Sequence, residues 1–248
     1  MAKTETTRGY LLNGRLSFRQ PAKGYRTGID PVLLAAAVPA RDGDRIFELG
    51  VGAGAAALCL LARVPGCTVT GEEIDPIAAA LAVDNSTANG LAKRLIMRSS
   101  SPQIQDGPPE RGFDHLMSNP PFWRATSGNR SPYPSKASAH HEGEIGIDKW
   151  MRDLCRRGGR RATVTAIYPA ARVTDLVTAL SPLAGDLSLF PLWPKERRQA
   201  KRVLVQAHLG SMGPARLLPG MVLHSEDGRY TKEAEAVLRE GKGIDLGA

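Results

Sequence analysis

Short apolar runs alternate with longer, more polar segments along most of the chain. The short runs are rich in branched and aromatic residues, which is typical of buried strands, and the segments between them contain helix-forming residues. Strands are predicted at 45–49, 68–71, 95–97, 113–117, 162–167, 187–192 and 202–209. Helices are predicted at 32–38, 55–63, 76–89, 147–156 and 232–239.

This order predicts an α/β fold of the Rossmann-like, doubly wound type, with a seven-stranded, mostly parallel sheet. Parallel neighbours need a crossover connection, and the intervening helices would provide it in the right-handed sense. The last two strands are separated only by the polar stretch 194–201, so they predict an antiparallel hairpin at the edge of the sheet. Ligands of such sheets bind at the carboxyl ends of the strands.

Two of the predicted helices begin with residues that cap helix starts. Asp30 stands before Pro31, and Asp75 stands before Pro76. A carboxylate at the N-cap accepts hydrogen bonds from the free N–H groups of the first turn, where proline is also well tolerated. Asp30 and Asp75 are therefore predicted as N-caps.

A glycine-rich turn follows the first predicted core strand, in the segment ELGVGAG at residues 48–54. Gly50, Gly52 and Gly54 let the backbone turn sharply and approach a ligand closely, and the next helix presents free N–H groups to it. Nucleotide-binding domains of several classes use this arrangement. The turn, with Glu48 before it, predicts a cofactor site without identifying the cofactor.

An acidic position follows the next strand, where Glu73 precedes Ile74. A carboxylate at this place can accept hydrogen bonds from both ribose hydroxyls of an adenosine group. The alternative role for an acidic residue here is a helix cap, but Asp75 suits that role. Glu73 is therefore predicted to hold a ribose.

The sequence NPPF follows the fourth predicted strand and comprises Asn119, Pro120, Pro121 and Phe122. The prolines stiffen the backbone and keep Asn119 out of the helical region, which fixes its side-chain oxygen and the adjoining carbonyls as acceptors. Hydrogen-bond acceptors that bind the two hydrogens of an exocyclic base amine orient its lone pair towards a methyl donor. Phe122 would stack on the base. These four residues are the predicted catalytic group.

The ordered set of glycine turn, acidic residue and NPPF resembles the class I amino-methyltransferases. It is similar in particular to the bacterial tRNA1(Val) (adenine-37-N6)-methyltransferase family, as are the segments 14–16, 24–30 and 228–234. The resemblance implies a class I methyltransferase fold, S-adenosyl-L-methionine as cofactor, and N6 of adenine 37 in a tRNA anticodon loop as acceptor. The cofactor-binding residues that it implies are Glu48, Gly50, Gly52, Gly54, Glu73, Ile74, Arg26, Thr27, Gly28, Asp30, Ser99 and Ser100.

Ser99 and Ser100 mark a departure from the family pattern. Relatives often have an acidic or amide residue near the adenine ring after the third strand, whereas this chain has Arg98 followed by serines. A serine hydroxyl could replace that contact.

The charge balance is compatible with a nucleic-acid partner, although a basic balance also fits proteins that only need solubility. The chain has 33 Lys and Arg residues against 25 Asp and Glu, a formal net charge of +8, which attracts phosphates. Arg124 lies in a long polar segment after NPPF that would cover the substrate. The predicted RNA-binding residues are Arg124, Lys195, Arg197, Arg198, Lys201 and Arg202. For the last five, a charged sheet edge that blocks aggregation is an equally good explanation.

Composition limits the remaining possibilities. At 248 residues, 42% of them hydrophobic, the chain is expected to form one domain. Its predicted parts are an N-terminal extension (1–40), a Rossmann-like core (41–209) and a C-terminal extension (210–248). No apolar leader or membrane-length run occurs, so a cytoplasmic protein without membrane contact is expected.

Neither a metal site nor a disulfide is expected. Cys59, Cys67 and Cys155 do not form a CxxC pattern and are predicted as buried thiols. His140 and His141 are adjacent in a polar segment, without the helical spacing or the third ligand of a zinc site.

Several functions remain open at this point. The NPPF arrangement could hold guanine N2 of rRNA, a DNA adenine or a protein glutamine, and a non-catalytic RNA-binding module could retain the fold. A nicotinamide-dependent dehydrogenase is disfavoured, because GVGAG lacks the third spaced glycine of GxGxxG. The sequence leaves open whether the protein is a monomer or a homodimer.

Overall fold

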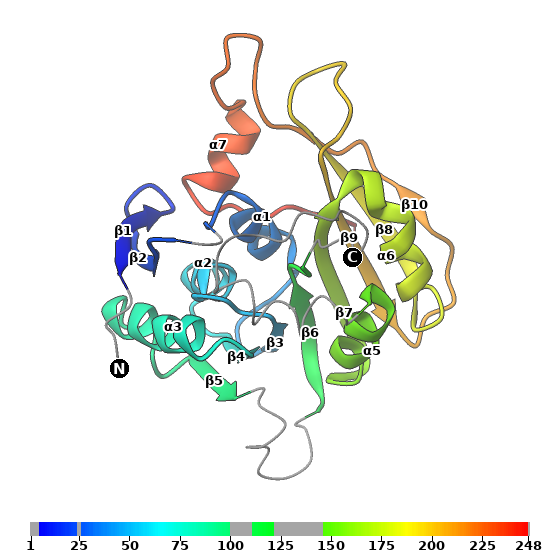
Figure 1. The fold of residues 1–248 in the computed structure, drawn as a ribbon. Helices are drawn as coiled ribbons and strands as arrows, with labels where there is room; N and C mark the ends of the chain where they lie inside the picture. The colour runs from blue at the N-terminus through cyan, green and yellow to red at the C-terminus, as the bar shows by residue number, and fades with distance from the viewer. Residues whose placement is uncertain (1–4, 24–25, 100–110, 122–145, 248) are drawn as a thin grey trace, which may run out of the picture.

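A computed structural model describes residues 5–23, 26–99, 111–121 and 146–247. Helices and strands alternate around one large sheet (Figure 1). The strands are β1 (Thr6–Leu11), β2 (Leu16–Pro21), β3 (Arg45–Leu49), β4 (Thr68–Glu73), β5 (Leu95–Ser99), β6 (Phe113–Ser118), β7 (Gly158–Pro169), β8 (Ala184–Trp193), β9 (Arg202–Leu209), β10 (Arg216–Leu217) and β11 (Met221–Val222). The helices are α1 (Asp30–Ala37), α2 (Ala55–Arg63), α3 (Pro76–Ala88), α5 (Ile147–Cys155), α6 (Val173–Leu180) and α7 (Lys232–Leu238).

The central sheet has the order β10-β8-β9-β7-β6-β3-β4-β5, with β11 also pairing with β8. Strands β3 to β7 are parallel to one another, and β9 runs antiparallel to both β7 and β8. The predicted α/β class and the antiparallel hairpin are confirmed. The predicted count of seven strands is wrong, because β10 and β11 extend the sheet to nine strands by pairing in parallel with β8.

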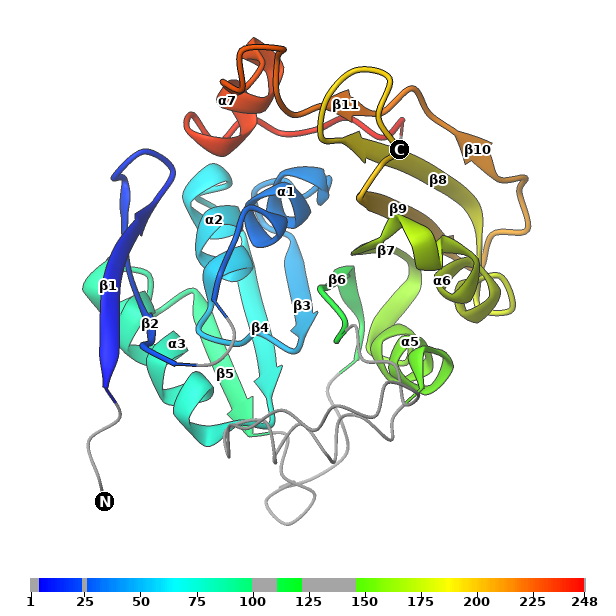
Figure 2. The ribbon, with the colours of Figure 1, turned by 45° about the horizontal axis from the view of Figure 1, so that its top comes forward.

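Helices cover both faces of this sheet (Figure 2). Helices α1, α2 and α7 contribute to one apolar cluster, while α5 and α6 contribute to a second cluster on the opposite face. The strands between them are buried from both sides. This burial explains why their sequences are nearly continuous apolar runs.

A separate two-stranded hairpin, β1 and β2, precedes the sheet and packs on α3. The backbone of Ser17 and Arg19 exchanges hydrogen bonds of 2.8 to 2.9 Å with the side chains of Asn89 and Asn85. The sequence pattern predicts only an N-terminal extension here, and it predicts no helix at the position of α6.

One of the two predicted helix caps is confirmed. The Asp75 carboxylate accepts a 2.9 Å hydrogen bond from the N–H of Ile77 at the start of α3. The N-cap of α1, in contrast, is Ile29. Asp30 is the first residue of that helix, where its carboxylate pairs with Arg202 instead of capping the first turn.

All three cysteines are buried, free thiols. Burial raises the pKa of Cys59 and of Cys155 to about 12. In the part of the chain that the structure describes, no cluster of His, Cys, Asp and Glu is suited to a metal ion, and no helix is long and apolar enough to cross a membrane.

Candidate active site

The register of the parallel sheet brings three strand ends level with one another. Leu49 at the end of β3 pairs with Glu72 on β4 and with Ser118 on β6. The residues that follow them in the chain are Gly50, Glu73 and Asn119. Motifs that are far apart in the sequence therefore meet at the carboxyl edge of the sheet, where α/β sheets bind ligands.

The glycine turn at this edge has the backbone that only glycine adopts easily. Gly50, Gly52 and Gly54 all have positive φ angles, of 77°, 58° and 92°. A side chain on Gly52 would have no neighbour within 4 Å among the described residues, whereas one on Gly54 would be 3.3 Å from Cβ of Ala82 on α3. The turn therefore packs against α3 at Gly54, and its space for a ligand is at Gly52.

The side chain of Glu73 is hydrogen-bonded to the backbone of the glycine turn. Its carboxylate accepts hydrogen bonds from the N–H of Gly52 at 2.7 Å and from that of Asp75 at 2.9 Å. Burial raises the pKa of Glu73, and these N–H donors partly offset the rise. The next residue, Ile74, is 41% exposed and presents an apolar surface beside the carboxylate.

Glu48 lies beneath the turn and is almost completely buried, at 2% exposure. Its Oε2 atom has no hydrogen-bond partner among the described residues. Burial raises the pKa of Glu48 well above its ordinary range, and the nearby charge of Glu73 raises it further. Among the described residues, Oε2 of Glu48 is therefore a buried oxygen atom that remains available for a hydrogen bond to a ligand.

Asn119 also has an unused polar atom. Its Oδ1 is buried and has no partner among the described residues, although a buried acceptor of this kind is normally paired. The residue before it, Ser118, donates to the carbonyl of Leu49 at 2.8 Å and accepts from Nε1 of Trp150 at 2.9 Å. The first residue of NPPF is thus tied to the strand that carries the glycine turn.

Ser118 and Trp150 were absent from the predicted site. Trp150 lies on α5 and packs against the glycine turn, so that a Cβ on Gly50 would be 3.0 Å from its Cζ2. No local pattern relates this tryptophan to Ser118, from which it is 32 positions distant. Contact between them depends on how α5 packs on the sheet.

The predicted N-terminal cofactor residues lie between the hairpin and α1. Arg26 is exposed and donates to the Thr7 hydroxyl at 3.2 Å, while the N–H of Thr27 donates to Gln20 at 2.8 Å. Asp30 is engaged with Arg202 at 2.7 Å. The remaining residue of this group, Gly28, is exposed.

Three predicted site residues, Phe122, Arg124 and Ser100, lie outside the described residues. His140 and His141, for which no metal site is expected, lie outside them as well. For Ser99 the description covers the backbone, which pairs with Glu73. The main-chain position of Ser99 is therefore beside the predicted ribose-binding residue.

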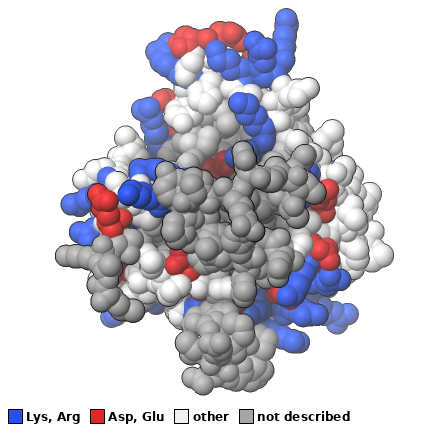
Figure 3. All heavy atoms as spheres, in the orientation of Figure 1, with Lys and Arg blue, Asp and Glu red and all other residues white. Residues whose placement is uncertain are grey.

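The predicted RNA-binding cluster occupies the connection between β8 and β9. Arg202 pairs with Pro169, the last residue of β7, so this connection lies at the carboxyl end of β7. Lys195 donates to the carbonyl of Glu226 at 2.9 Å. In Figure 3, Lys and Arg side chains lie at the top of the molecule among Asp and Glu side chains, and further Lys and Arg side chains lie at the left, where Figure 1 places the β1–β2 hairpin.

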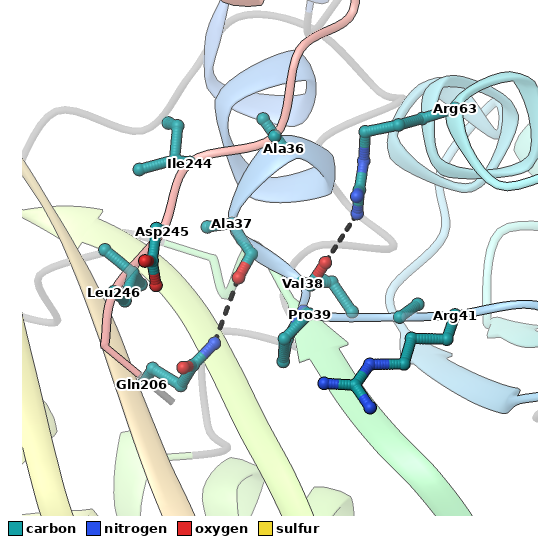
Figure 4. A pocket seen from close by; sticks show the side chains of 12 residues that line it. Ala36, Ala37, Val38, Pro39, Arg41, Arg63, Gln206, Ile244, Asp245 and Leu246 are labelled. Carbon is teal, nitrogen blue, oxygen red and sulfur yellow. Dashed lines mark hydrogen bonds between the residues drawn. The ribbon is translucent and has the colours of Figure 1, made fainter.

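A cavity of about 360 Å³ lies elsewhere in the molecule. Its lining includes Arg41, four residues before β3, and Gln206 of β9, which donates to the carbonyl of Ala37 (Figure 4). Arg41 precedes β3 whereas Gly50 follows it. The cavity is therefore near the opposite end of β3 from the glycine turn.

Comparison with known proteins identifies the family. The model of the methyltransferase small domain family matches residues 27–131. A tRNA1(Val) (adenine(37)-N6)-methyltransferase of Aeromonas hydrophila is 30% identical over 217 residues, which cover 83% of this chain and 85% of that protein. The chain belongs to this family. The resemblance drawn from the sequence motifs is confirmed.

Other relatives carry the same name. The protein of this name from Porphyromonas gingivalis is 33% identical over 65% of the chain and 66% of its own length, and that from Vibrio campbellii is 23% identical over 94% and 95%. The family therefore covers the N-terminal hairpin and the C-terminal extension as well as the central motifs.

Solved structures support the fold. A predicted O-methyltransferase from Agrobacterium tumefaciens superposes with a TM-score of 0.70 at 21% identity, covering 87% of this chain and 98% of that one. TYW2 of M. jannaschii, in complex with AdoMet, has a TM-score of 0.56 at 13% identity, covering 84% and 74%. The class I methyltransferase fold expected for this family is confirmed.

Proposed function

We propose that this protein transfers the methyl group of S-adenosyl-L-methionine to N6 of adenine 37 in tRNA1(Val). The family supports the reaction, and the observation in the structure that supports it best is the buried Oδ1 of Asn119, which has no hydrogen-bond partner among the described residues. A tRNA substrate also favours a cytoplasmic location.

The residues at the carboxyl edge fit the cofactor. Within the part of the chain that the structure describes, the space beside Gly52 is open to a ligand, and Oε2 of Glu48 has no hydrogen-bond partner. Glu73 retains lone pairs for ribose hydroxyls after accepting from two backbone N–H groups. Ile74 would pack on the adenine ring, and Ser99 would lie near it. When bound, S-adenosyl-L-methionine supplies an electrophilic methyl group on a positively charged sulfur.

Asn119 and Pro120 are proposed to bind the amine group that accepts the methyl group. The lone pair of an exocyclic amine is delocalised into the ring, so the nitrogen is a poor nucleophile. Oδ1 of Asn119 and the carbonyl of Pro120 would accept the two amine hydrogens, which favours a pyramidal nitrogen with its lone pair aimed at the methyl group. The new N–C bond forms as the methyl–sulfur bond breaks, and the nitrogen then loses a proton to water.

In this proposal the orientation of the amine promotes methyl transfer, and no strong general base is required. Pro121 restricts the backbone that follows, and Phe122 is proposed to stack on the target base. The adenine must leave its stack to reach the recessed edge, which costs little in an anticodon loop because its bases are already partly unpaired. The 195–202 cluster is proposed to hold phosphates of the same RNA.

Asn119→Ala tests the role of the amide oxygen. We expect the variant to bind S-adenosyl-L-methionine like the wild type in calorimetry, because Asn119 would contact the acceptor. Transfer of label from the cofactor into a tRNA1(Val) transcript should be abolished, with N6-methyladenosine identified by nucleoside mass spectrometry. Full turnover by this variant would overturn the assignment.

A transcript with guanine at position 37 provides the matched substrate control, and it should remain unlabelled. Total rRNA, DNA and protein are to be tested alongside it. Label in one of these fractions alone would retain the chemistry but move the substrate. No label in any fraction would favour the non-catalytic RNA-binding module.

A further inference from the structure

The β1–β2 hairpin has one buried face and one exposed face. Leu16, Phe18 and Gln20 of β2 are buried, and they alternate with residues that point away from the core. The outward residues are Thr6, Arg8 and Tyr10 on β1, together with Ser17, Arg19 and Pro21 on β2. Most of the side chains on this outward face are polar or charged, and Tyr10 is its one aromatic residue.

The two arginines on this face are directly opposite each other. Arg8 pairs in register with Arg19, and both side chains are exposed. Like charges placed directly across a strand pair destabilise it. Within residues 5–23, 26–99, 111–121 and 146–247, no carboxylate forms an ion pair with either arginine. An anion from another molecule would relieve this repulsion.

Tyr10 lies beside these cations with its ring largely free. Its side chain is 63% exposed, and the Arg8 guanidinium lies 5.7 Å from the ring centroid. Arg8 also donates to the Ser17 hydroxyl at 3.2 Å, which helps to fix its direction. Exposed aromatic rings next to arginines are typical of surfaces that bind single-stranded nucleic acid, where phosphates pair with the cations and bases stack on the ring.

The hairpin is held at a fixed place relative to the glycine turn. The Asn85 side chain bonds both the N–H and the carbonyl of Arg19 at 2.8 Å, and also donates to the carbonyl of Ala53 at 2.9 Å. At the end of the hairpin, Arg26 and Thr27 bond to Thr7 and Gln20. The exposed face is therefore a rigid surface connected to the methyl-transfer site.

The charge of this region is predominantly positive. Residues 5–23 contain Arg8, Arg15, Arg19 and Lys23 against a single acidic residue, Glu5. We propose that the outward face of the hairpin, through Arg8, Tyr10 and Arg19, binds the tRNA substrate beside its target nucleotide. The inference rests on the proposed function, since it requires an RNA substrate. It adds a second contact surface to the 195–202 cluster.

The test compares two charge-removing variants of the full-length protein. Arg8→Gln/Arg19→Gln removes the opposed pair, while Arg160→Gln/Arg161→Gln removes two exposed arginines near the start of β7, at the other end of the parallel strands. Binding of a tRNA1(Val) transcript is measured by fluorescence anisotropy at several salt concentrations. The dissociation constant of S-adenosyl-L-methionine is measured by calorimetry for each protein.

We expect the hairpin variant to bind the transcript about 10-fold to 100-fold more weakly, as for the loss of two charge-assisted contacts. Its slope of log affinity against log salt should be shallower by about 1.5. Tyr10→Ala should weaken binding about 10-fold with the wild-type salt slope. Cofactor binding should stay unchanged in all variants, and the control pair should bind the transcript like the wild type.

Thermal stability separates binding from structural damage. Because Arg8→Gln/Arg19→Gln removes a repulsion, its Tm should equal or exceed that of the wild type. A hairpin variant with wild-type affinity and salt slope would overturn the docking surface while the wild type still methylates tRNA. Wild-type protein that neither binds nor methylates any RNA would overturn the proposed function and the docking surface together. Methylation of protein alone would assign the hairpin to a different partner and overturn the RNA proposal.

Discussion

Ser118→Ala tests whether the position of Asn119 depends on one buried hydroxyl. Ser118 is completely buried, donates to Leu49 and accepts from Trp150. The change removes the hydrogen bond to Leu49, of net value about 1 kcal/mol, and leaves the indole N–H of Trp150 without its acceptor, which costs about 1 to 3 kcal/mol. We expect the free energy of unfolding to fall by about 2 to 4 kcal/mol, which lowers Tm by roughly 5 to 15 °C.

The effect on activity should exceed what this instability explains. Without the hydroxyl, the backbone before Asn119 is no longer tied to the end of β3, and a small displacement of a reacting group lowers turnover about 10-fold to 100-fold. Labelled methyl transfer at saturating cofactor and tRNA gives kcat, well below the melting temperature. Calorimetry should show nearly unchanged cofactor binding, because Ser118 is placed on the acceptor side of the site.

Ser188→Ala is the matched control. Ser188 is also a buried serine in a strand, at 2% exposure, and accepts a 3.0 Å hydrogen bond from Arg216 on β10. We expect it to lower Tm without changing kcat. Trp150→Phe removes the other half of the Ser118 contact, so the double variant should cost less than the sum of the two single changes. If Ser118→Ala and Ser188→Ala show equal kcat, the positioning role is refuted.

Two further predictions concern groups whose pKa is raised by burial. In the unfolded chain Glu48 ionises at its ordinary pKa of about 4.5, so the stability of the folded protein falls as pH rises from that value towards the raised pKa of the folded state. Glu48→Gln should flatten this part of the plot of unfolding free energy against pH, measured by urea titration, and an unchanged slope of that plot would contradict the assignment. Cys59 and Cys155, with pKa values near 12, should resist a thiol reagent at pH 8 until the protein unfolds, whereas rapid labelling of the folded protein would show that these helices open.

The strand–turn–helix unit at the donor site could be predicted from local signals. The apolar run of β3, the alternate glycines and the apolar helix that follows specify that unit, and the predicted helix 55–63 has the observed bounds of α2. Asp75 could be recognised as a cap because it precedes Pro76. The predicted positions of Glu48, Glu73 and Asn119 also follow from strand ends, since parallel strands end at a common edge.

The N-terminal hairpin could not be predicted in the same way. Its turn places Leu12 at positive φ, which leucine rarely adopts, and its strands are stabilised by Asn85 and Asn89 from another part of the chain. The cap of α1 fails for a similar reason. The Asp30 carboxylate is drawn to Arg202, 172 positions away, so tertiary pairing overrides the local preference.

The reaction depends on strand register more than on motif spacing. The intervals between Gly50, Glu73 and Asn119 are set by helices and connections that contribute no atoms to these residues. A slip of β6 by one residue would replace Asn119 at the edge and turn the side chains of that strand to the opposite face. Leu49 opposite Ser118 fixes this register, and the serine hydroxyl adds a hydrogen bond across the same pair. A residue without a role in the chemistry can therefore control it.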